Sequence, residues 1–250
     1  MIDIQGISKS FNGRQVLNNL SLKIPAEKTT VIIGRSGCGK SVLLKHIMRI
    51  LKPEAGLIYI DGQEITRLEE KEMNKLRLKM GMVFQGGALF DSLTVAENVG
   101  FGLIENTKLD RKTILEKVRR SLDLVGLEGI EERWPAELSG GMKKRVALAR
   151  AICLEPKIIL YDEPTTGVDP ITADAINELI INTRDKLGVT SIVVTHDMTS
   201  AYKVADRIAM MFGGRIIKEG ISTDIQKSDD PYVHQFINGL STGPITETSL

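Results

Sequence analysis

Apolar and polar residues alternate in two stretches near the start of the chain. The alternation runs from Ile2 to Ile7 and again from Val16 to Ile24, with Asn12-Gly13 between the two stretches. A period of two predicts half-buried strands, and Asn-Gly is typical of a tight turn between antiparallel strands. We therefore predict that the chain begins with an antiparallel strand pair.

Further along, short apolar runs without alternation predict strands that are buried on both faces. These runs are Thr29–Ile33, Leu57–Ile60, Gly81–Phe84, Lys157–Tyr161, Ser191–Thr195 and Ile208–Phe212. The last run is followed by Gly213-Gly214 and by Arg215–Lys218, an order typical of a hairpin. Together these runs predict a sheet at the core of the protein.

Helical periodicity separates the apolar runs. It predicts helices at Val42–Met48, Ile65–Lys79, Val95–Leu103, Arg111–Val125, Ser139–Arg150 and Ile171–Leu187, and two short helices within Ser222–Gly239. From Ser92 to Glu137 the strand pattern is scarce, which indicates a helical insertion with its own small core. The pattern as a whole predicts an α/β fold that has a mixed sheet core, an antiparallel β subdomain and an inserted α-helical subdomain at about 92–150.

The predicted elements form a single domain over residues 1–240, followed by a polar, mobile C-terminal tail at 241–250. Just before the tail, Tyr232, Val233, Phe236 and Ile237 fall on one face of the last predicted helix. Two interpretations remain open for this apolar face. It either contacts a second copy of the chain or packs within the same copy.

Composition narrows the class of protein. Of the 250 residues, 42% are hydrophobic, enough for a large core, and the net charge of +1 provides no overall field that would recruit nucleic acid. Cys38 and Cys153 show neither a metal-binding spacing nor a disulfide framework, which suits a reducing cytoplasm. No apolar run approaches the roughly 18 residues of a membrane helix, and the N-terminus lacks a signal-peptide pattern. We therefore expect any contact with a membrane to be made through a partner.

The most specific chemical motif is Gly-Arg-Ser-Gly-Cys-Gly-Lys-Ser at Gly34–Ser41. It lies between a predicted strand and a predicted helix, which is the context of a phosphate-binding loop. Glycines let successive backbone N–H groups point at phosphate oxygens, and the helix N-terminus adds its positive end. Lys40 would reach the β- and γ-phosphates, and the Ser41 hydroxyl would bind Mg²⁺. The predicted nucleoside triphosphate site consists of Gly34, Arg35, Ser36, Gly37, Cys38, Gly39, Lys40, Ser41 and Val42.

Two adjacent carboxylates, Asp162 and Glu163, follow the buried strand Lys157–Tyr161. In a domain with a phosphate loop, Asp162 can bind Mg²⁺ directly or through water, and Glu163 can polarise the water that attacks the γ-phosphate. A surface turn is the alternative, but it does not explain why an apolar run leads into the carboxylates. We therefore predict that the pair belongs to the nucleotide site.

Three single residues allow both a structural and a functional interpretation. Gln85 follows one predicted strand and is either a plain polar residue or a contact to Mg²⁺ or the attacking water. His196 follows another, and it is either structural or a hydrogen-bonding partner of the γ-phosphate and that water. Phe11, just before the first turn, either packs on the turn or stacks on an adenine ring.

Leu-Ser-Gly-Gly-Met at residues 138–142 opens a predicted helix. Ser139 is a typical N-cap, and Gly140 and Gly141 leave backbone N–H groups uncovered at the helix start, which makes an anion site. Lys143, Lys144 and Arg145 follow, and each taken singly is interpreted as part of a solvated helix face.

The phosphate loop, Gln85, the Ser139-Gly140-Gly141 signature, Asp162-Glu163 and His196, in this order, resemble the ATP-binding subunit of ABC transporters over nearly the whole chain. The resemblance implies an ATPase with a P-loop NTPase fold of ABC type, whose cofactors are ATP and Mg²⁺. It implies that Ser41, Gln85 and Asp162 hold the Mg²⁺. It also implies that Phe11 stacks on adenine, that Glu163 is the general base and that His196 senses the γ-phosphate.

The same resemblance implies a head-to-tail homodimer. Ser139, Gly140 and Gly141 would touch the γ-phosphate of ATP held by a second copy, and Asp169 would lie in a loop that crosses to that copy. Two nucleotide sites would form only when the copies close, so ATP binding and dimerisation are linked. Gln85 would connect the Mg²⁺ and water to the transporter interface. Met142 stands where many relatives carry Gln, so one amide contact is missing.

Two segments, Phe84–Val95 and Gly141–Val146, are similar to the ATPases of the Mla type, which work with MCE-domain lipid-binding proteins. The similarity implies a subunit that energises transport of phospholipids or other hydrophobic molecules. It would bind multispanning permease subunits at the cytoplasmic side of the inner membrane, with small residues after Gln85 accepting a short permease helix, and an MCE-domain protein would be a further partner. The alternative is the ATPase of an amino-acid or other small-solute importer, or of a lipoprotein-releasing system.

A soluble ABC ATPase that acts on nucleic acid or ribosomes is the hypothesis from another class. Such proteins usually carry two cassettes or a long coiled-coil insertion, and often a basic surface. This chain has one cassette, no long heptad run and a net charge of +1, so we expect no nucleic-acid partner. The presence of Glu163 and His196 disfavours a regulatory subunit that binds ATP without hydrolysing it.

Overall fold

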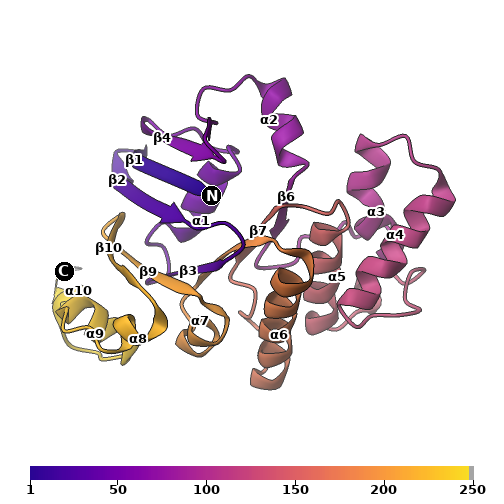
Figure 1. The fold of residues 1–250 in the computed structure, drawn as a ribbon. Coiled ribbons are helices and arrows are strands. Elements are labelled where there is room, and N and C mark those ends of the chain that lie inside the picture. Colours follow the sequence, from indigo (N-terminus) through magenta and orange to yellow (C-terminus); the bar gives the residue numbers. More distant parts are fainter. Residues whose placement is uncertain (248–250) are drawn as a thin grey trace. The chain divides into compact units, whose positions relative to one another are not determined.

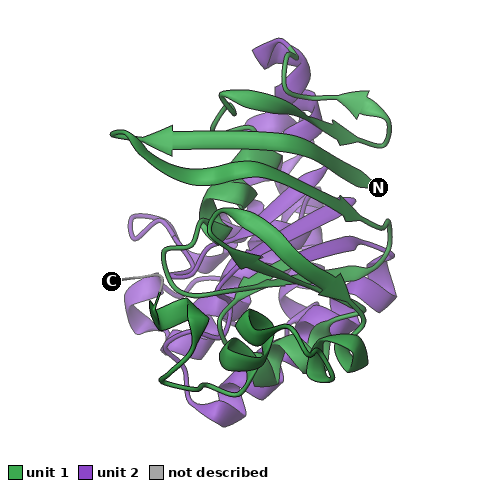
Figure 2. Cartoon of the chain, turned by 90° about the vertical axis from the view of Figure 1, so that its left-hand side faces the viewer, with its two compact units in different colours: residues 1–68, 193–250 green, residues 69–192 purple. Residues whose placement is uncertain are grey.

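The computed structural model describes residues 1–247, and the chain divides into two compact units (Figure 2). The first unit contains Met1–Leu68 and the segment from Val193 onward, and the second contains Glu69–Ile192. Figure 1 labels most of the elements of both units. The middle of the chain thus forms a unit of its own, with the two ends of the chain joined in the other.

An antiparallel sheet forms the N-terminal part of the first unit, with the strand order β2-β1-β4-β5 (Figure 1). Its strands are β1 (Ile2–Phe11), β2 (Arg14–Ile24), β4 (Ala55–Ile60) and β5 (Gln63–Glu64). Ile2 pairs with Ile24 across the first two strands, and Asn12 and Gly13 adopt positive φ in the turn between them. The predicted strand pair is confirmed, with Ile2, Ile4 and Ile7 buried, and a register shift between Ile4 and Ile7 explains why the spacing changes from two residues to three.

A second sheet in the first unit supports the phosphate loop. It has the order β10-β9-β3, followed by the last residues of β8 (Thr190–Thr195), a strand that crosses from one unit to the other. Strand β3 (Thr29–Ile33) is fully buried and runs parallel to β9 (Arg207–Phe212), which forms the predicted hairpin with β10 (Arg215–Gly220). The helices of this unit are α1 (Lys40–Ile47), α7 (Met198–Val204), α8 (Ser222–Gln226), α9 (Pro231–Ile237) and α10 (Pro244–Glu247).

The second unit combines a parallel strand pair with a group of helices. The first residues of β8 are followed in the sheet by β7 (Ile158–Asp162) and β6 (Met80–Val83), which are buried along their whole length. The helices are α2 (Glu70–Arg77), α3 (Val95–Asn106), α4 (Arg111–Leu124), α5 (Gly140–Ile152) and α6 (Pro170–Leu187), with a 3-10 turn at Pro135–Glu137. Helices α3, α4 and α5 pack on one another, as predicted for the helical insertion, and α5 also packs on β6.

Local chemistry explains where these helices begin. Thr94 and Glu97 form a reciprocal capping box at the start of α3, and Asp110 accepts a hydrogen bond from the Thr113 amide at the start of α4. On the inner side, α3 lies close to its neighbours because Gly102 has no side chain, and a Cβ there would meet Leu154 at 2.6 Å. The helical core is therefore built from capped, closely packed helices.

One predicted helix, Ile65–Lys79, is wrong at its N-terminal end. The observed helix α2 begins only at Glu70, because Ile65 and Thr66, just after β5, are hydrogen-bonded to strand β4. The Ile65 amide donates to the Ile58 carbonyl at 2.9 Å, and the Thr66 hydroxyl accepts from the Ile58 amide at 2.9 Å. These bonds to the nearby strand β4 override the local helical pattern.

The segment predicted as a polar, mobile tail contains a short packed helix within residues 241–247, and residues 248–250 lie outside the described part of the chain. Helix α10 folds back on α9, where Gln235 is buried. The Gln235 side chain accepts from the Ile245 amide at 2.8 Å and donates to the Leu240 carbonyl at 3.2 Å. Ile245 is only 3% exposed, and the polar composition of the segment gave no indication of this burial.

The apolar face before this segment packs within the chain. Val233 is fully buried, and the Tyr232 ring lies 4.8 Å from the Phe212 ring, centroid to centroid. The two short helices predicted within Ser222–Gly239 are confirmed as α8 and α9. Packing within one copy therefore explains these two residues without a second copy.

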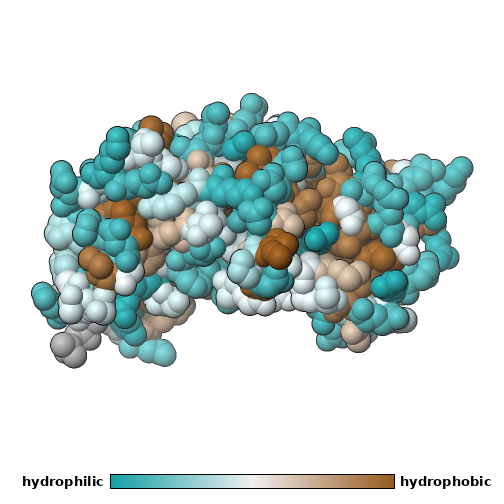
Figure 3. Space-filling view, turned by 90° about the horizontal axis from the view of Figure 1, so that it is seen from below, coloured by the Kyte–Doolittle hydropathy of each residue, from teal (hydrophilic) through white to brown (hydrophobic). Residues whose placement is uncertain are grey.

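The surface of the molecule is mostly polar on the face shown in Figure 3. On the face shown in Figure 3, hydrophilic side chains surround separate hydrophobic patches. Within residues 1–247, no helix combines the length and apolar character needed to cross a membrane.

Candidate functional site

The phosphate loop of the first unit connects the buried strand β3 to helix α1. Gly39 precedes the helix in a left-handed conformation with φ 110°, and no side chain caps the helix N-terminus. The Lys40 side chain is 5% exposed, and its Nζ donates to the Gly34 carbonyl at 2.8 Å and to the Arg35 carbonyl at 3.2 Å. The loop thus curls around its own lysine and has the backbone geometry of an anion cradle.

The glycines of the loop serve two different purposes. A Cβ at Gly34 would lie 2.5 Å from the Met211 carbonyl oxygen and 2.9 Å from Cys38 Sγ, so a side chain there has no room. A Cβ at Gly37 would enter open space with no described atom within 4 Å, yet Gly37 has φ +78°. Gly34 is therefore required for packing, whereas Gly37 is required for backbone conformation and for close approach of a ligand.

The structure places Phe11 and His196 in the same unit as the phosphate loop. Phe11, at the end of β1, is 39% exposed, and Lys9 Nζ lies 5.5 Å from its ring centroid. His196 follows β8 and is exposed, and the next residue, Asp197, caps α7 by accepting from the Thr199 amide at 3.0 Å. Both predicted residues thus lie at the ends of strands and are accessible, which suits contact with a ligand.

The two predicted carboxylates lie in the second unit. Asp162 is the last residue of β7, and Asp162 and Glu163 are 9% and 8% exposed. Glu163 has φ +49°, a conformation uncommon for a residue with a side chain, and its Oε2 accepts from the Thr166 hydroxyl at 3.1 Å. The backbone turn therefore holds Glu163 in a defined position, as a general base requires.

Gln85 follows β6, and its side chain is exposed. Its backbone carbonyl accepts a hydrogen bond from Lys144 Nζ at 2.9 Å. Lys144 is only 9% exposed, so the interpretation of Lys144 as a solvated helix residue is wrong. Burial lowers the pKa of Lys144, and the negative charge of Glu163 opposes that shift.

The signature Ser139-Gly140-Gly141 lines an open pocket of about 330 Å³ within the second unit. The Ser139 hydroxyl caps α5 by accepting from the Met142 amide at 3.3 Å. Asp169 caps α6 by accepting from the Thr172 amide at 3.0 Å. The lining residues are Ser139, Gly140, Gly141, Met142, Arg145, Gly167, Val168, Asp169 and Thr172. The N-terminus of α5 and the Arg145 side chain favour an anion in this hollow, whereas the N-terminus of α6 is already occupied by the Asp169 carboxylate.

Close packing shapes this signature pocket. A Cβ at Gly141 would meet Thr172 Cγ2 at 2.7 Å, so only glycine lets the starts of α5 and α6 approach. The Thr172 hydroxyl also donates to Asp169 at 2.6 Å, and this bond holds the pKa of Asp169 below its usual range. Sequence reasoning missed the contribution of Arg145 and Thr172, although the Asp-Pro pair at 169–170 marks a helix start.

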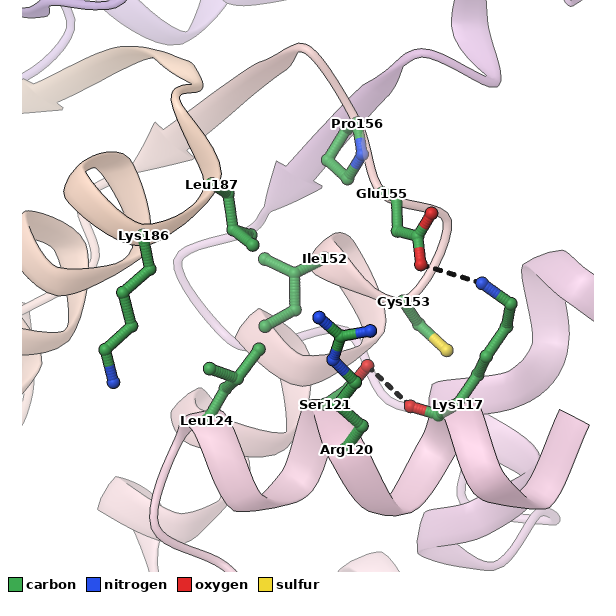
Figure 4. A pocket seen from close by; sticks show the side chains of 10 residues that line it. All are labelled: Lys117, Arg120, Ser121, Leu124, Ile152, Cys153, Glu155, Pro156, Lys186 and Leu187. Atoms are coloured by element: carbon green, nitrogen blue, oxygen red, sulfur yellow. Dashed lines mark hydrogen bonds and ion pairs between the residues drawn. The ribbon is translucent and has the colours of Figure 1, made fainter.

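A second pocket in this unit, of about 280 Å³, lies between α4, the end of α5 and the end of α6 (Figure 4). Its lining includes an ion pair between Lys117 and Glu155 at 2.7 Å, and the Ser121 hydroxyl donates to the Lys117 carbonyl at 2.9 Å. Cys153 also lines it, and burial raises the pKa of its thiol, so this cysteine is not an activated nucleophile. The residues predicted for the nucleotide site are all absent from its lining.

Comparison with known proteins decides the family. The model of the ABC transporter family matches residues 17–166. The intermembrane phospholipid transport system ATP-binding protein MlaF of Haemophilus influenzae is 42% identical over 98% of this chain and 93% of its own length. The chain belongs to the ABC transporter family.

Other relatives of this ABC transporter protein carry a different cargo in their names. The probable ribonucleotide transport ATP-binding protein mkl of Mycobacterium leprae is 41% identical over 98% of this chain and 70% of its own length. Among solved structures, the dimeric ABC transporter cassette MJ0796 has a TM-score of 0.82 at 34% identity, covering 88% of this chain and 98% of that chain. The structure of cbiO1 from Clostridium perfringens has a TM-score of 0.83 at 32% identity, and the match covers 96% of this chain and 95% of cbiO1.

The family and the fold make this chain an ATPase cassette that binds ATP. Another structure of MJ0796 is a dimer in a post-hydrolysis state bound to ADP and phosphate, with a TM-score of 0.81 at 33% identity over 88% of this chain and 98% of that one. The α/β fold with an antiparallel sheet and a mixed sheet is likewise that of an ABC-type P-loop NTPase.

Proposed function

We propose that this chain hydrolyses ATP to energise an ABC transporter that moves phospholipids or other hydrophobic molecules between membranes. Phospholipid transport is the named function of MlaF, which the chain matches from end to end. The similarity to mkl extends over a smaller share of that protein, so it supports ribonucleotide transport less well. The amino-acid or small-solute importer and the lipoprotein-releasing system remain the alternative.

The observation that carries the proposed mechanism is the signature pocket. It presents the N-terminus of α5 and the Arg145 side chain beside Gly140, where a Cβ would meet no described atom within 4 Å. A γ-phosphate carried by a second copy fits such a site by charge. In the proposed head-to-tail homodimer, Ser139, Gly140 and Gly141 of each copy bind the ATP of the other.

The predicted site residues supply the other roles. The loop from Gly34 to Val42 binds the phosphates, Phe11 stacks on the adenine, Glu163 takes the proton of the attacking water and His196 binds the γ-phosphate. Gln85 positions the water and communicates with the transporter. The strained turn at Glu163 and its bond from Thr166 support the general-base role, since a base must be held in place.

Ser41, Gln85 and Asp162 would hold Mg²⁺, which supplies charge neutralisation at the phosphates when it is bound. Their hydroxyl, amide and carboxylate oxygens match the ligands that Mg²⁺ prefers. Within residues 1–247 there is no group of three or more His, Cys, Asp or Glu side chains that could hold a metal unaided. Because Mg²⁺ demands near-octahedral coordination, phosphate oxygens of the nucleotide and water would supply the remaining ligands.

The partners follow from the same proposal. Residues 1–240 act as one ABC ATPase domain, with the helices between about 92 and 150 as the subdomain that meets multispanning permease subunits. After Gln85, the Phe90 and Phe101 rings are 44% and 37% exposed and pack at 4.8 Å, a compact apolar surface suited to a short permease helix. The chain would be peripheral at the cytoplasmic side of the inner membrane, with an MCE-domain protein as a further subunit.

The test is recovery of the intact complex in mild detergent. Glu163→Gln chains with ATP should retain permease subunits, an MCE-domain protein and phospholipid, which mass spectrometry identifies. Without the general base, ATP is not hydrolysed and the dimer stays closed. The matched control Lys40→Ala, which should bind ATP more weakly, should need a higher ATP concentration for this retention. A permease with a soluble solute-binding protein would overturn the lipid-transport proposal in favour of an importer. Recovery of nucleic acid or ribosomes without a permease would favour the soluble ATPase.

A further inference from the structure

Two cations of helix α5 bind backbone carbonyls of the loop that follows Gln85. Lys144 Nζ donates to the Gln85 carbonyl at 2.9 Å. Arg150 donates through NH1 to the Ala88 carbonyl at 2.6 Å and through NH2 to the Gly87 carbonyl at 2.7 Å. The loop 85–88 is therefore attached to α5 at three of its four carbonyl groups.

The backbone contact between loop and helix is equally close. A Cβ at Gly87 would lie 3.4 Å from the Lys143 carbonyl oxygen and 3.7 Å from Ala147 Cβ. Gly87 and Ala88 both adopt positive φ, and the Gly87 amide donates to the Phe84 carbonyl at 2.8 Å. The loop has a single, defined turn that lies on α5 between its two cations.

Burial makes these cations dependent on their carbonyl partners. Lys144 is buried and Arg150 half-buried, and burial lowers the pKa of both side chains. A buried charge without hydrogen bonds is strongly unfavourable, and a hydrogen bond from a charged donor is about twice as strong as a neutral one. Loop 85–88 consequently has a strong energetic preference to stay attached to α5.

We propose that Lys144 and Arg150 are positioning residues that make loop 85–88 and the signature helix α5 move as one body. The inference rests on the proposed function, in which the N-terminus of α5 binds the ATP of a second copy. A displacement of α5 on ATP binding then carries Gln85 with it, so that Gln85 reaches its working position only when the signature is engaged.

This role differs from that of a residue that merely stabilises the fold. Neither cation belongs to the phosphate loop at 34–41, so its loss should leave ATP affinity unchanged. The kcat should fall because Gln85 is no longer delivered to its position. We expect a loss of kcat of about tenfold for Lys144→Met or Arg150→Met, the size of one charge-assisted hydrogen bond, with KM for ATP within about twofold.

Hydrogen exchange of the full-length chain tests the coupling without relying on turnover. On the Glu163→Gln background, ATP should slow amide exchange in the signature segment 138–143 and in the loop segment 84–90. Lys144→Met and Arg150→Met should keep the ATP protection of segment 138–143 and lose that of segment 84–90. Lys144→Arg, which keeps a charged donor, should restore the protection of segment 84–90. Lys143→Met, on the same helix, is the matched control and should keep both protections.

Each outcome decides between the claims. Loop protection that persists in both methionine variants overturns the positioning role while leaving the proposed function intact. No ATP protection of the signature segment in the parent chain counts against the dimer mechanism instead. If the signature segment shows no ATP protection, exchange without nucleotide still tests the attachment of loop 85–88 to α5. Faster exchange of segment 84–90 in the methionine variants than in the parent chain supports the attachment, and unchanged exchange overturns the attachment. If Arg150→Met does not fold, the Lys144→Met variant alone decides.

Discussion

The phosphate loop and the signature pocket each contain one helix N-terminus suited to an anion, that of α1 and that of α5, but they are built in opposite ways. The phosphate loop is one continuous segment that curls around Lys40, whose Nζ already lies 2.8 Å from the Gly34 carbonyl. The signature pocket joins residues 139–145 to residues 167–172 and remains an open hollow. A loop that encloses its own cation suits a nucleotide held by the same copy. An open pocket at the start of α5, with Arg145 in its lining, suits one delivered by another copy.

The largest expected effect is on the hydrolysis step, with ATP binding at the two anion sites left intact. Glu163→Gln removes the proposed base while preserving the shape of the turn, so kcat should fall by about 10² to 10⁴ with ATP still bound. Steady-state hydrolysis and calorimetric titration of ATP measure the two quantities. Glu116→Gln, an exposed carboxylate of the same unit, is the control and should behave as wild type. Near-normal turnover by Glu163→Gln would exclude it as the base.

Next in size is the loss of the phosphate-loop cation. Lys40→Ala should weaken ATP binding by about tenfold to a hundredfold, because a charge-assisted contact to the phosphates is lost. Calorimetry gives the affinity directly, and Lys45→Ala, an exposed lysine on the same helix, should leave it unchanged. Unaltered binding in Lys40→Ala would show that the loop is not the cradle for the chain's own nucleotide.

The two signature glycines provide a sharper contrast within one pocket. Gly141→Ala should lower the free energy of unfolding by about 1 to 3 kcal/mol, since its Cβ would lie 2.7 Å from Thr172 Cγ2. Gly140→Ala, whose Cβ enters open space, should not lower it. Urea unfolding of the isolated chain compares the two variants.

The second-site change Thr172→Ser is the decisive control for that clash. It removes Cγ2 and keeps the hydroxyl that donates to Asp169, so it should recover most of the stability lost in Gly141→Ala. If the double variant is as unstable as Gly141→Ala, the contact between α5 and α6 is not what requires glycine at position 141.

The smallest effect concerns the helix that carries the phosphate loop. His46 of α1 is fully buried, and its Nδ1 lies 2.7 Å from the Val42 carbonyl oxygen. Burial lowers the pKa of His46 below its ordinary value of 6.5. The folded chain therefore binds a proton less readily than the unfolded chain, and stability is lost as pH falls below about 6.5 toward the lowered pKa.

Urea unfolding at pH 7.5 and pH 5.5 measures this loss. His46→Gln should lose less stability than wild type between the two values, by about 1 kcal/mol. His234→Gln, which changes an exposed histidine of the same unit, should lose as much as wild type. Equal losses in wild type and His46→Gln would show that burial of His46 does not govern the pH dependence.

Motifs that are continuous in sequence were the most accessible to prediction. The phosphate loop, the cap at Ser139 and the strand leading to Asp162 depend on neighbours within a few residues, and the structure has them in the predicted secondary structure. Helix α2 and the C-terminal segment were predicted less well. Hydrogen bonds from Ile65 to Ile58 and from Ile245 to Gln235 join residues of different elements, and the periodicity within one element does not reveal them.

The amino-acid sequence by itself determined the order of motifs, the buried strands and the family, because backbone geometry and hydrophobic periodicity act over a few residues. Only the tertiary structure decided that Lys144 is buried on the Gln85 carbonyl rather than solvated, and that Arg145 and Thr172 help line the signature pocket. A charged residue on a helix has the same local pattern whether it faces water or a loop. Its role depends on what packs against that helix, and packing is set by the whole fold.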